Sequence, residues 1–472
     1  MAEHFPPEEK KELKIEETNI PGLLVVHLPV HGDDRGWFKE NWQREKMIGL
    51  GLPDFNPVQN NISYNAKRGA TRGIHTEPWE KFVSVAKGKI FAAWVDMRSG
   101  YEPNVFTIEM DASTAVFVPR GVGNSYQALE DDTVYTYLVN DHWTPDGQYT
   151  SLNLADSTAN INWPIPLDQA EISEKDKKTP FYDQAEKVLP KKVLITGANG
   201  QLGKALQEYY PNAECVDLES FNISDEKAYS SRHWKDYELI INAAAYTNVD
   251  GAETPEGREL SWQANAHAVK LLAKTALENN ITLVHVSSDY VFDGTKVPHT
   301  EDEPFSPLSV YGQSKAAGDV AASLAPKHYI MRTSWVVGKG KNFVKTMKEL
   351  AEKGVEPAVV NDQLGRLTFT DTLASAIHHL VSKEAEYGTY NITNDGEVVS
   401  WADIAKIVYE KTGHNPESVT GIPTAEYYKG QQGIAPRPLG SELDLTKIKS
   451  TGFKPRDWQE ALAEYLKELN NQ

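Results

Sequence analysis

The feature of this sequence that most restricts its fold is the stretch VLITGANGQLGKAL, which begins at Val193. An apolar run leads into three spaced glycines, and an amphipathic segment with Leu202, Leu206 and Tyr209 on one helical face follows. Such glycines permit a tight turn, a close approach of a pyrophosphate to the backbone, and close packing of the helix on its strand. The stretch therefore predicts the strand, loop and helix that open a dinucleotide-binding domain.

The position of this loop predicts another domain ahead of it. The chain has 472 residues, which is too many for one ordinary hydrophobic core, and about two fifths of them precede the loop. The segment ISEKDKKTPFYDQAEKVLPKK, just before the loop, is charged and punctuated by proline, as domain boundaries are. We expect a polar extension at residues 1–19, a domain at 20–180, a linker at 181–190 and a second domain at 191–472.

Composition excludes several classes of protein. The formal net charge of −19 argues against general affinity for nucleic acid or for an anionic membrane. Cys215 is the only cysteine, so neither an intrachain disulfide nor a cysteine-based zinc site can form, and we expect a small buried thiol at a strand end. The chain has no signal-peptide pattern and no run of about 18 apolar residues, which indicates a soluble cytoplasmic protein.

The two halves of the chain differ in their hydrophobic pattern. Residues 20–165 contain short apolar strands separated by turn signals, with no clear amphipathic helix, and this predicts an all-β sandwich or barrel. After residue 191, apolar strands alternate with helical segments. That alternation predicts an α/β domain with a doubly wound parallel sheet.

Asp217 bears on the choice of cofactor. It lies 20 residues after Gly197, at the end of the next predicted strand, where a carboxylate can bind the ribose 2′-hydroxyl. A carboxylate there would repel a 2′-phosphate. The cofactor is therefore predicted to be NADH or NADPH, with Asp217 favouring NADH.

Three further residues suggest reduction of a carbonyl group. Tyr311 and Lys315 are four positions apart on a predicted helix, so they share a face. A lysine ammonium beside a phenol favours the phenolate, and we expect it to lower the pKa of Tyr311 toward neutrality. Such a tyrosine can protonate a carbonyl oxygen while hydride reaches the carbon, and Ser288 can donate a second hydrogen bond to that oxygen.

With these residues in view, the second half of the chain resembles a known family. LITGANGQLG, INAAAYTNVDGAE, SSDYVFDG, PLSVYGQSK, RTSWVVG, NDQLGRLT and APRPLGSELD resemble motifs of the dTDP-4-dehydrorhamnose reductases. These extended short-chain dehydrogenases reduce the 4-keto group of a nucleotide-linked deoxysugar, and the resemblance covers 191–472. It implies a Rossmann fold with a small substrate-binding subdomain.

The resemblance also implies roles for individual residues. Ser288, Tyr311 and Lys315 would be catalytic, and Ser288 stands where the family more often has threonine. Leu367 stands where the family usually has proline before Thr368. Cofactor contacts would come from Gly197, Asn199, Gly200, Gln201, Leu202, Gly203, Asp217, Ala243, Ala244, Ala245, Tyr311 and Lys315, and substrate contacts from Asp289, Tyr290, Trp335 and Arg437.

The first half resembles a different family. DDRGWFKENW, PVQNNISYNAKRGATRGIHTEPWEKFV and NINWPIPLDQAEISEKD resemble motifs of the dTDP-4-dehydrorhamnose 3,5-epimerases, whose fold is a cupin jelly roll. A 4-keto group acidifies the protons on its neighbouring carbons, so a base can remove one and an acid can return it on the opposite face. The implied catalytic set is His75 as base, Asp176 as its orienting carboxylate, Lys81 as the cation for the enolate, and Tyr137 as acid.

Other positions in this half follow from the same resemblance. GIHTE holds only one histidine, whereas a metal-binding cupin needs several clustered ligands, so we expect no metal. In GVGNSY, Asn124 replaces a second histidine of the family's active site. Substrate contacts would come from Arg35, Glu40, Gln59, Asn61 and Arg72.

Together the two halves predict a bifunctional enzyme of dTDP-L-rhamnose biosynthesis. It would epimerise dTDP-4-dehydro-6-deoxy-D-glucose at carbons 3 and 5, and would then reduce the 4-keto group with NAD(P)H. Two alternatives stay open: a monofunctional reductase with a non-catalytic sugar-binding or assembly cupin domain, and a non-catalytic regulatory or scaffold protein. The partner would be a dTDP-linked 4-keto-6-deoxy sugar, with no nucleic acid and no membrane. The epimerase family's tendency to dimerise suggests a homodimer.

Overall fold

The computed structural model describes residues 12–145 and 147–470 and divides into two compact units, Met1–Pro190 and Lys191–Gln472. Residues 1–11 of the expected polar extension lie outside the described residues, and residues within 14–17 of that extension form a strand. Within the described ranges, no helix combines the length and the apolar character needed to cross a membrane.

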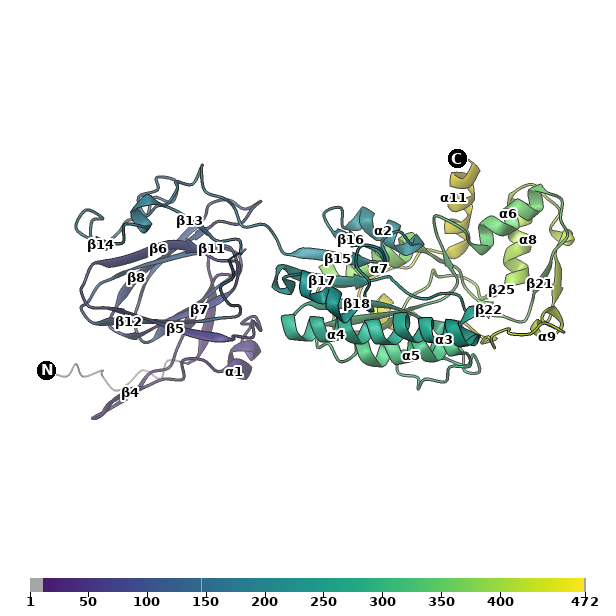
Figure 1. Cartoon of the computed structure of the whole chain (residues 1–472), viewed down its shortest axis with the longest axis horizontal. Coiled ribbons are helices and arrows are strands. Elements are labelled where there is room, and N and C mark those ends of the chain that lie inside the picture. Colours follow the sequence, from purple (N-terminus) through teal and green to yellow (C-terminus); the bar gives the residue numbers. More distant parts are fainter. Residues whose placement is uncertain (1–11, 146, 471–472) are drawn as a thin grey trace. The chain divides into compact units, whose positions relative to one another are not determined.

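The first unit consists of two β-sheets that face each other (Figure 1). The first sheet has the order β1 (Lys14–Glu17), β2 (Leu24–His27), β10 (Thr114–Val118), β7 (Lys81–Lys87), β12 (Thr133–Val139), β5 (Gln59–Asn65). The second has the order β13 (Thr150–Ser151), β6 (Ala70–Thr76), β11 (Val122–Ala128), β8 (Ile90–Asp96), β9 (Val105–Met110), with β14 (Glu171–Ile172) beside β6. Side chains from both sheets, including Val83, Trp94 and Tyr126, form the core between them.

Successive strands of this unit mostly change sheet instead of forming hairpins. β7 and β8 flank the turn at Gly88, yet β7 belongs to the first sheet and β8 to the second. Gly88 has a φ of +82°, and a Cβ there would lie 2.5 Å from the Thr133 hydroxyl, so glycine suits this crossing. The two-sheet, cupin-like fold expected for this half is confirmed.

Three further segments complete the first unit. β3 (His31–Asp33) and β4 (Gly36–Phe38) form an exposed hairpin, and a short helix that the sequence pattern did not indicate, α1 (Arg44–Gly49), follows it. Residues of the expected linker contact this unit: Ala185 is buried in one of its clusters, and the Val188 N–H donates to the Met97 carbonyl (2.9 Å).

The second unit is built on a parallel sheet between helices. Its strand order is β16 (Glu214–Val216), β15 (Lys192–Thr196), β17 (Tyr237–Asn242), β18 (Thr282–Ser288), β19 (His328–Thr333), β24 (Gly388–Asn391). One face packs on α4 (Ala268–Asn279) and the end of α5 (Val310–Ala322), and the other on α2 (Gln201–Tyr209) and α7 (Thr370–Ser382) (Figure 1). The predicted Rossmann-type α/β sheet is confirmed.

A separate hydrophobic cluster forms a smaller subdomain in this unit. It packs α6 (Phe343–Glu352), α8 (Trp401–Lys411) and α11 (Trp458–Asn470) together. Strand pairs accompany them: β20 (Val336–Val337) with β23 (Thr368–Phe369), β21 (Ala358–Val360) with β26 (Thr420–Ile422), and β22 (Leu364–Gly365) with β25 (Val399–Ser400). The remaining α-helices among the described residues of this unit are α3 (Pro255–Trp262), α9 (Thr424–Tyr427) and α10 (Thr446–Ser450).

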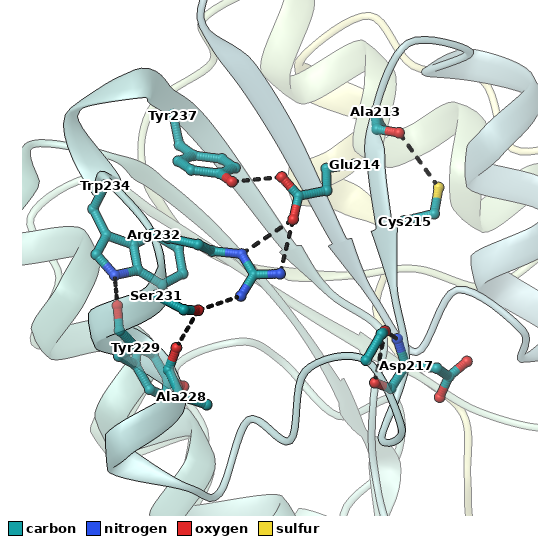
Figure 2. Close-up of polar contacts among 11 residues, drawn as sticks. Ala213, Glu214, Cys215, Asp217, Ala228, Tyr229, Ser231, Arg232, Trp234 and Tyr237 are labelled. Atoms are coloured by element: carbon teal, nitrogen blue, oxygen red, sulfur yellow. Dashed lines mark hydrogen bonds and ion pairs between the residues drawn. The ribbon is translucent and has the colours of Figure 1, made fainter. Parts of the chain in front are cut away.

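An ion pair between Glu214 and Arg232 stabilises the edge strand β16 (Figure 2). The Glu214 carboxylate accepts hydrogen bonds from Arg232 (2.8 Å) and from the Tyr237 hydroxyl (2.5 Å). Cys215 is exposed, so the expectation of a buried thiol is wrong. Successive side chains of β16 point to opposite faces of the sheet, and the packed segments bury Val216 but leave Cys215 exposed.

Candidate active sites

The glycine loop of the second unit forms a cradle that suits a dinucleotide. Gly197 has a φ of +67°, and a Cβ on Gly203 would lie 2.2 Å from the Gly197 carbonyl oxygen, so neither position accepts a side chain without rearrangement. Gly200 is the N-cap of α2 and has no side chain to pair with the free N–H groups of the first turn. Those N–H groups can bind a pyrophosphate, and so the residues present fit an NAD(P) cofactor.

Asp217 holds this loop directly. Its Oδ2 accepts a hydrogen bond from the Asn199 backbone N–H at 2.8 Å. The same carboxylate lines the cavity beside the loop. It can therefore both shape the glycine loop and meet a ribose hydroxyl.

A single cavity of about 1190 Å³ joins the glycine loop to the residues expected to be catalytic. Its walls come from the carboxyl ends of the parallel strands, which is where doubly wound sheets bind ligands. The predicted residues that line it are Gly197, Asn199, Gly200, Gln201, Leu202, Gly203, Asp217, Ala243, Ala244, Ala245, Ser288, Asp289, Tyr290, Tyr311, Lys315 and Trp335.

Helix α5 presents Tyr311 and Lys315 to this cavity. Its N-terminus is fixed by the Ser309 side chain, which accepts from the Gly312 N–H, and by Glu253, which accepts from the Val310 N–H (2.9 Å). The Lys315 ammonium donates to the Val286 carbonyl at 2.6 Å. Burial lowers the pKa of Lys315 to about 8, although the nearby Asp319 carboxylate opposes this shift.

The expected lowering of the Tyr311 pKa is wrong for the structure described here. Burial raises the pKa of this phenol above its ordinary value, the charge of Asp289 raises it further, and a hydrogen bond with Ser288 only partly offsets the rise. The cost of desolvating a phenolate exceeds the benefit of a cation that is itself hydrogen-bonded to Val286. The Tyr311 phenol is therefore protonated at neutral pH.

Ser288 and Asp289 lie side by side at the end of β18. The Ser288 hydroxyl donates to the Asp289 carboxylate at 2.9 Å. Asp289 is 2% exposed, and burial raises its pKa to about 6, against the lowering effect of Ser441 and Ser288. The Tyr290 ring meets the Tyr311 ring edge-on, with their centroids 5.4 Å apart.

Behind Lys315 lies a buried polar group that the sequence pattern did not single out. Asp319, one turn further along α5, accepts a hydrogen bond from Arg332 of β19 at 2.9 Å. Both side chains are almost fully buried. The spacing of Lys315 and Asp319 was the available signal, because residues four apart on a helix share a face.

Two predicted substrate residues have different surroundings. The Trp335 ring stacks on the Trp401 ring with centroids 3.8 Å apart, and it lines the cavity. Arg437 is not among the lining residues of that cavity; it pairs instead with Asp250 (2.8 Å) and lies over the Tyr428 ring (5.1 Å). Asp250 was also missed by the sequence reasoning, although it lies within a quoted motif.

In the first unit the structure brings His75 and Asp176 together. His75 belongs to β6, and Asp176 begins a 3-10 turn about 100 residues later. The His75 Nε2 and the Asp176 Oδ1 are 2.7 Å apart, with the carboxylate 6% exposed and the imidazole 41% exposed. With Nε2–H donating to the carboxylate, Nδ1 carries the lone pair of a base.

Lys81 and Tyr137 come from the opposite sheet and lie together. The Lys81 ammonium is nearly buried, forms an ion pair with Glu77, and lies 5.8 Å from the centroid of the Tyr137 ring. Burial raises the pKa of Tyr137, and the charge of Glu77 raises it further, so the phenol stays protonated. Glu77 was not predicted, because it lies in the connection between β6 and β7, where no helical or strand period indicates which side chains meet.

Asn124 links the two sheets at this site. It lies opposite His75 in the pairing of β11 with β6, and its side-chain oxygen accepts from the Tyr135 hydroxyl of β12 at 3.3 Å. The Tyr135 ring in turn lies 5.7 Å from the Tyr137 ring. The asparagine that replaces the family's second histidine therefore bonds to a buried phenol in this structure.

Only some of the residues predicted to bind the sugar and nucleotide lie near the catalytic candidates of this unit. Asn61 lies opposite Tyr137 in the pairing of β5 with β12, and Gln59 bonds to it at 2.8 Å. Arg72 of β6 donates to the side chain of Asn65, the last residue of β5, at 3.1 Å. Arg35 and Glu40 instead face solvent, paired with Asp33 and Lys46, and in the described ranges no hydrogen bond joins either to the four catalytic candidates.

The folds and sites define a protein in which a cupin-like domain precedes an NAD(P)-binding, Rossmann-type domain of the short-chain dehydrogenase class. The chain belongs to the family of the RmlD substrate binding domain, which matches residues 191–471, and residues 17–184 match the dTDP-4-dehydrorhamnose 3,5-epimerase family.

Individual relatives cover one half of the chain each. The protein RmlC homolog of Streptococcus pyogenes serotype M6 is 46% identical over 180 residues, which is 36% of this chain and 90% of that protein. The dTDP-4-dehydrorhamnose reductase of Aggregatibacter actinomycetemcomitans is 38% identical over 291 residues, 57% of this chain and 97% of that protein. A crystal structure of the Bacillus anthracis dTDP-4-dehydrorhamnose reductase in complex with NADP is 33% identical, with a TM-score of 0.54, and covers 59% of this chain and 99% of that one.

Proposed function

We propose that this chain is a bifunctional enzyme of dTDP-L-rhamnose biosynthesis. Its first unit would epimerise dTDP-4-dehydro-6-deoxy-D-glucose at carbons 3 and 5, and its second would reduce the 4-keto group of the product. The observation that best supports two activities is the hydrogen bond between His75 and Asp176, because a domain that only bound the sugar would not need an oriented base. The order follows from the chemistry, since epimerisation needs the ketone that reduction removes.

In the first unit, His75 Nδ1 would take the acidic proton from a carbon beside the ketone. Asp176 would then stabilise the imidazolium, and Lys81 would stabilise the negative charge on the 4-oxygen of the enolate. Tyr137 would return a proton to the opposite face. Its raised pKa and its origin in the opposite sheet support this role.

In the second unit, Tyr311 would donate its proton to the oxygen of the 4-keto group, and Ser288 would hydrogen-bond to the same oxygen. A nicotinamide cofactor, when bound, supplies the hydride. As the phenolate forms, the nearby charge of Lys315 would stabilise it, and Asp319 would help to keep that lysine charged.

We infer that the cofactor is NADH or NADPH, with Asp217 favouring NADH. The carboxylate lines the cavity and is held at the glycine loop by the Asn199 N–H. If it repels the 2′-phosphate, Asp217→Asn should lower the KM for NADPH and change that for NADH little, because asparagine keeps an oxygen acceptor for Asn199. Steady-state kinetics with both cofactors measure this; an unchanged ratio of the two KM values would remove Asp217 as the determinant.

Solvent deuterium exchange tests the epimerase half. We expect the full chain, without cofactor, to incorporate deuterium at carbons 3 and 5 of the 4-keto sugar, and His75→Ala to abolish this. Absence of exchange in the wild-type chain would favour the monofunctional reductase with a non-catalytic cupin domain. Absence of both exchange and NAD(P)H oxidation would favour the regulatory or scaffold alternative.

We also propose that the chain is a homodimer. In the first unit, β5 is an edge strand whose side chains Ile62 and Tyr64 are 70% and 58% exposed. Phe38 of the exposed β3–β4 hairpin is 66% exposed. Apolar side chains on an open sheet edge are well suited to pairing with a second copy. Light scattering after size-exclusion chromatography should give twice the chain mass, and Ile62→Lys should reduce it.

A further inference from the structure

The segment Tyr428–Pro438 of the second unit is hydrogen-bonded to Asp250, and the proposed reaction gives this carboxylate no role. The segment follows α9 and forms neither helix nor strand, and Lys429 and Gln432 within it are exposed. Within the described residues, its hydrogen bonds to the nucleotide-binding part of the unit are made to one side chain, Asp250, which follows β17. The Asp250 carboxylate accepts from the Ala435 N–H (3.0 Å) and from the Arg437 Nη2 (2.8 Å).

This carboxylate fixes both the backbone and the charge of the segment. Arg437 also donates from Nη1 to the carbonyl of Ala435 (2.9 Å). Hydrogen bonds to Asp250 and to Ala435 therefore both orient the guanidinium. Its side chain is 14% exposed, whereas that of Asp250 is 41% exposed. The Tyr428 ring lies beneath the guanidinium at 5.1 Å.

Among the described residues, two hydrogen bonds use donors of the Arg437 guanidinium, so its other donors are available to a ligand. The group has five N–H donors, of which Asp250 and Ala435 use two. Three are left, enough for the bidentate contact that arginine makes with phosphate oxygens. A side chain held in place before binding loses less conformational entropy when the ligand arrives.

We propose that Asp250 is a positioning residue that preorganises Arg437 and the segment Tyr428–Pro438 for the diphosphate of the nucleotide sugar. This rests on the proposed function of the second unit. Asp250 touches neither the reacting carbonyl nor the nicotinamide in this account. Its loss should therefore weaken substrate binding while leaving the chemical step almost intact.

The kinetic test compares Asp250→Ala with two matched variants. Asp250→Ala should raise the KM for the dTDP-linked 4-keto sugar about tenfold, while kcat and the KM for NAD(P)H stay within about twofold. Asp250→Asn keeps the acceptor for Ala435 but loses the charge, so its KM should fall between those of wild type and Asp250→Ala. Asp54→Ala removes an aspartate–arginine pair of the first unit and should leave all three parameters unchanged.

A double-mutant cycle separates positioning from a general structural role. If Asp250 acts through Arg437, then Asp250→Ala should add less than about twofold to the KM of an Arg437→Ala chain. An effect that persists in full in that background would overturn the proposal, as would a wild-type KM in Asp250→Ala itself.

Proteolysis gives a readout that does not depend on turnover. A lysine-specific protease should cut after Lys429 at least about threefold faster in Asp250→Ala than in wild type, because the segment has lost its attachment. Adding dTDP should slow that cut in wild type but not in Asp250→Ala. Failure of wild type to oxidise NAD(P)H would contradict the proposed function, whereas equal cleavage of the two chains, with or without dTDP, would contradict this inference alone.

Discussion

At the scale of single residues, the second unit keeps several ionisable groups out of water at its cavity. Lys315 is buried with a pKa of about 8, Asp289 is buried with a pKa of about 6, and burial raises the pKa of Tyr311. Each of these shifts is a free-energy cost borne by the folded state at the pH where the charged form is required. Burial of these groups at the cavity therefore lowers the stability of the second unit.

Asp289 gives a measurable form of this cost. Its pKa rises from 3.8 in the unfolded chain to about 6 in the folded one, so the folded state binds more protons between these pH values, and unfolding becomes easier as pH rises through them. The cost is absent below pH 3.8 and complete above about pH 6, where it amounts to about 3 kcal/mol. Asp289→Asn should therefore raise the melting temperature of the second unit more at about pH 8 than at about pH 5. Scanning calorimetry checks this, and an equal gain at both pH values would contradict it.

The orienting role of Asp176 also belongs to this scale. Asp176→Asn keeps the size of the side chain but lacks the charge that, in the proposed mechanism, stabilises the imidazolium of His75, and it should slow deuterium exchange about 10²-fold. His75→Ala should abolish the exchange. If Asp176→Asn exchanged at the wild-type rate, the hydrogen bond would have only a structural role.

At the scale of elements, the glycine loop and α2 are the proposed binding site for the pyrophosphate of the cofactor. A Cβ at position 203 would lie 2.2 Å from the Gly197 carbonyl, so Gly203→Ala must displace the loop or the helix. We expect a rise of at least about tenfold in the KM for NAD(P)H, since the N–H groups of the first turn would move away from the pyrophosphate. Deuterium exchange by the first unit serves as the internal control and should not change. A wild-type KM for the cofactor would show that the close packing is not required.

The N-terminus of α5 has a comparable role for the catalytic pair. Ser309 caps the helix that carries Tyr311 and Lys315, and the loss of such a cap costs about 1 kcal/mol. Ser309→Ala should lower the free energy of unfolding of the second unit by about this amount, measured by urea denaturation. If the free energy of unfolding did not change, Glu253, which accepts from the Val310 N–H, would be sufficient to hold this helix end.

Sequence patterns predicted these elements better than they predicted the environment of single side chains. The spacing of Tyr311 and Lys315 placed both on one helix face, because the helical period is a local property. The exposure of Cys215 depends on which face of β16 other segments cover, and the raised pKa of Tyr311 depends on burial and on the hydrogen bond of Lys315 to Val286. The exposure of Cys215 and the pKa of Tyr311 both depend on packing between segments far apart in the sequence, which local sequence patterns do not predict.

At the scale of the whole molecule, the two candidate active sites lie in two compact units of one chain. Each unit has its own hydrophobic clusters. We therefore expect the activities to be separable by mutation. His75→Ala should retain reduction of an already epimerised ketone, and Tyr311→Phe should lose reduction by at least about 10²-fold while retaining deuterium exchange. Loss of both activities in either variant, with the fold intact by circular dichroism, would contradict this independence.

The most direct test of the bifunctional account is NMR analysis of the product formed in deuterated water. The purified chain is given dTDP-4-dehydro-6-deoxy-D-glucose and NADH or NADPH, with no other enzyme present. The account predicts dTDP-L-rhamnose that carries deuterium at carbons 3 and 5. A reduced sugar without deuterium at these carbons, or no reduced sugar at all, would contradict it.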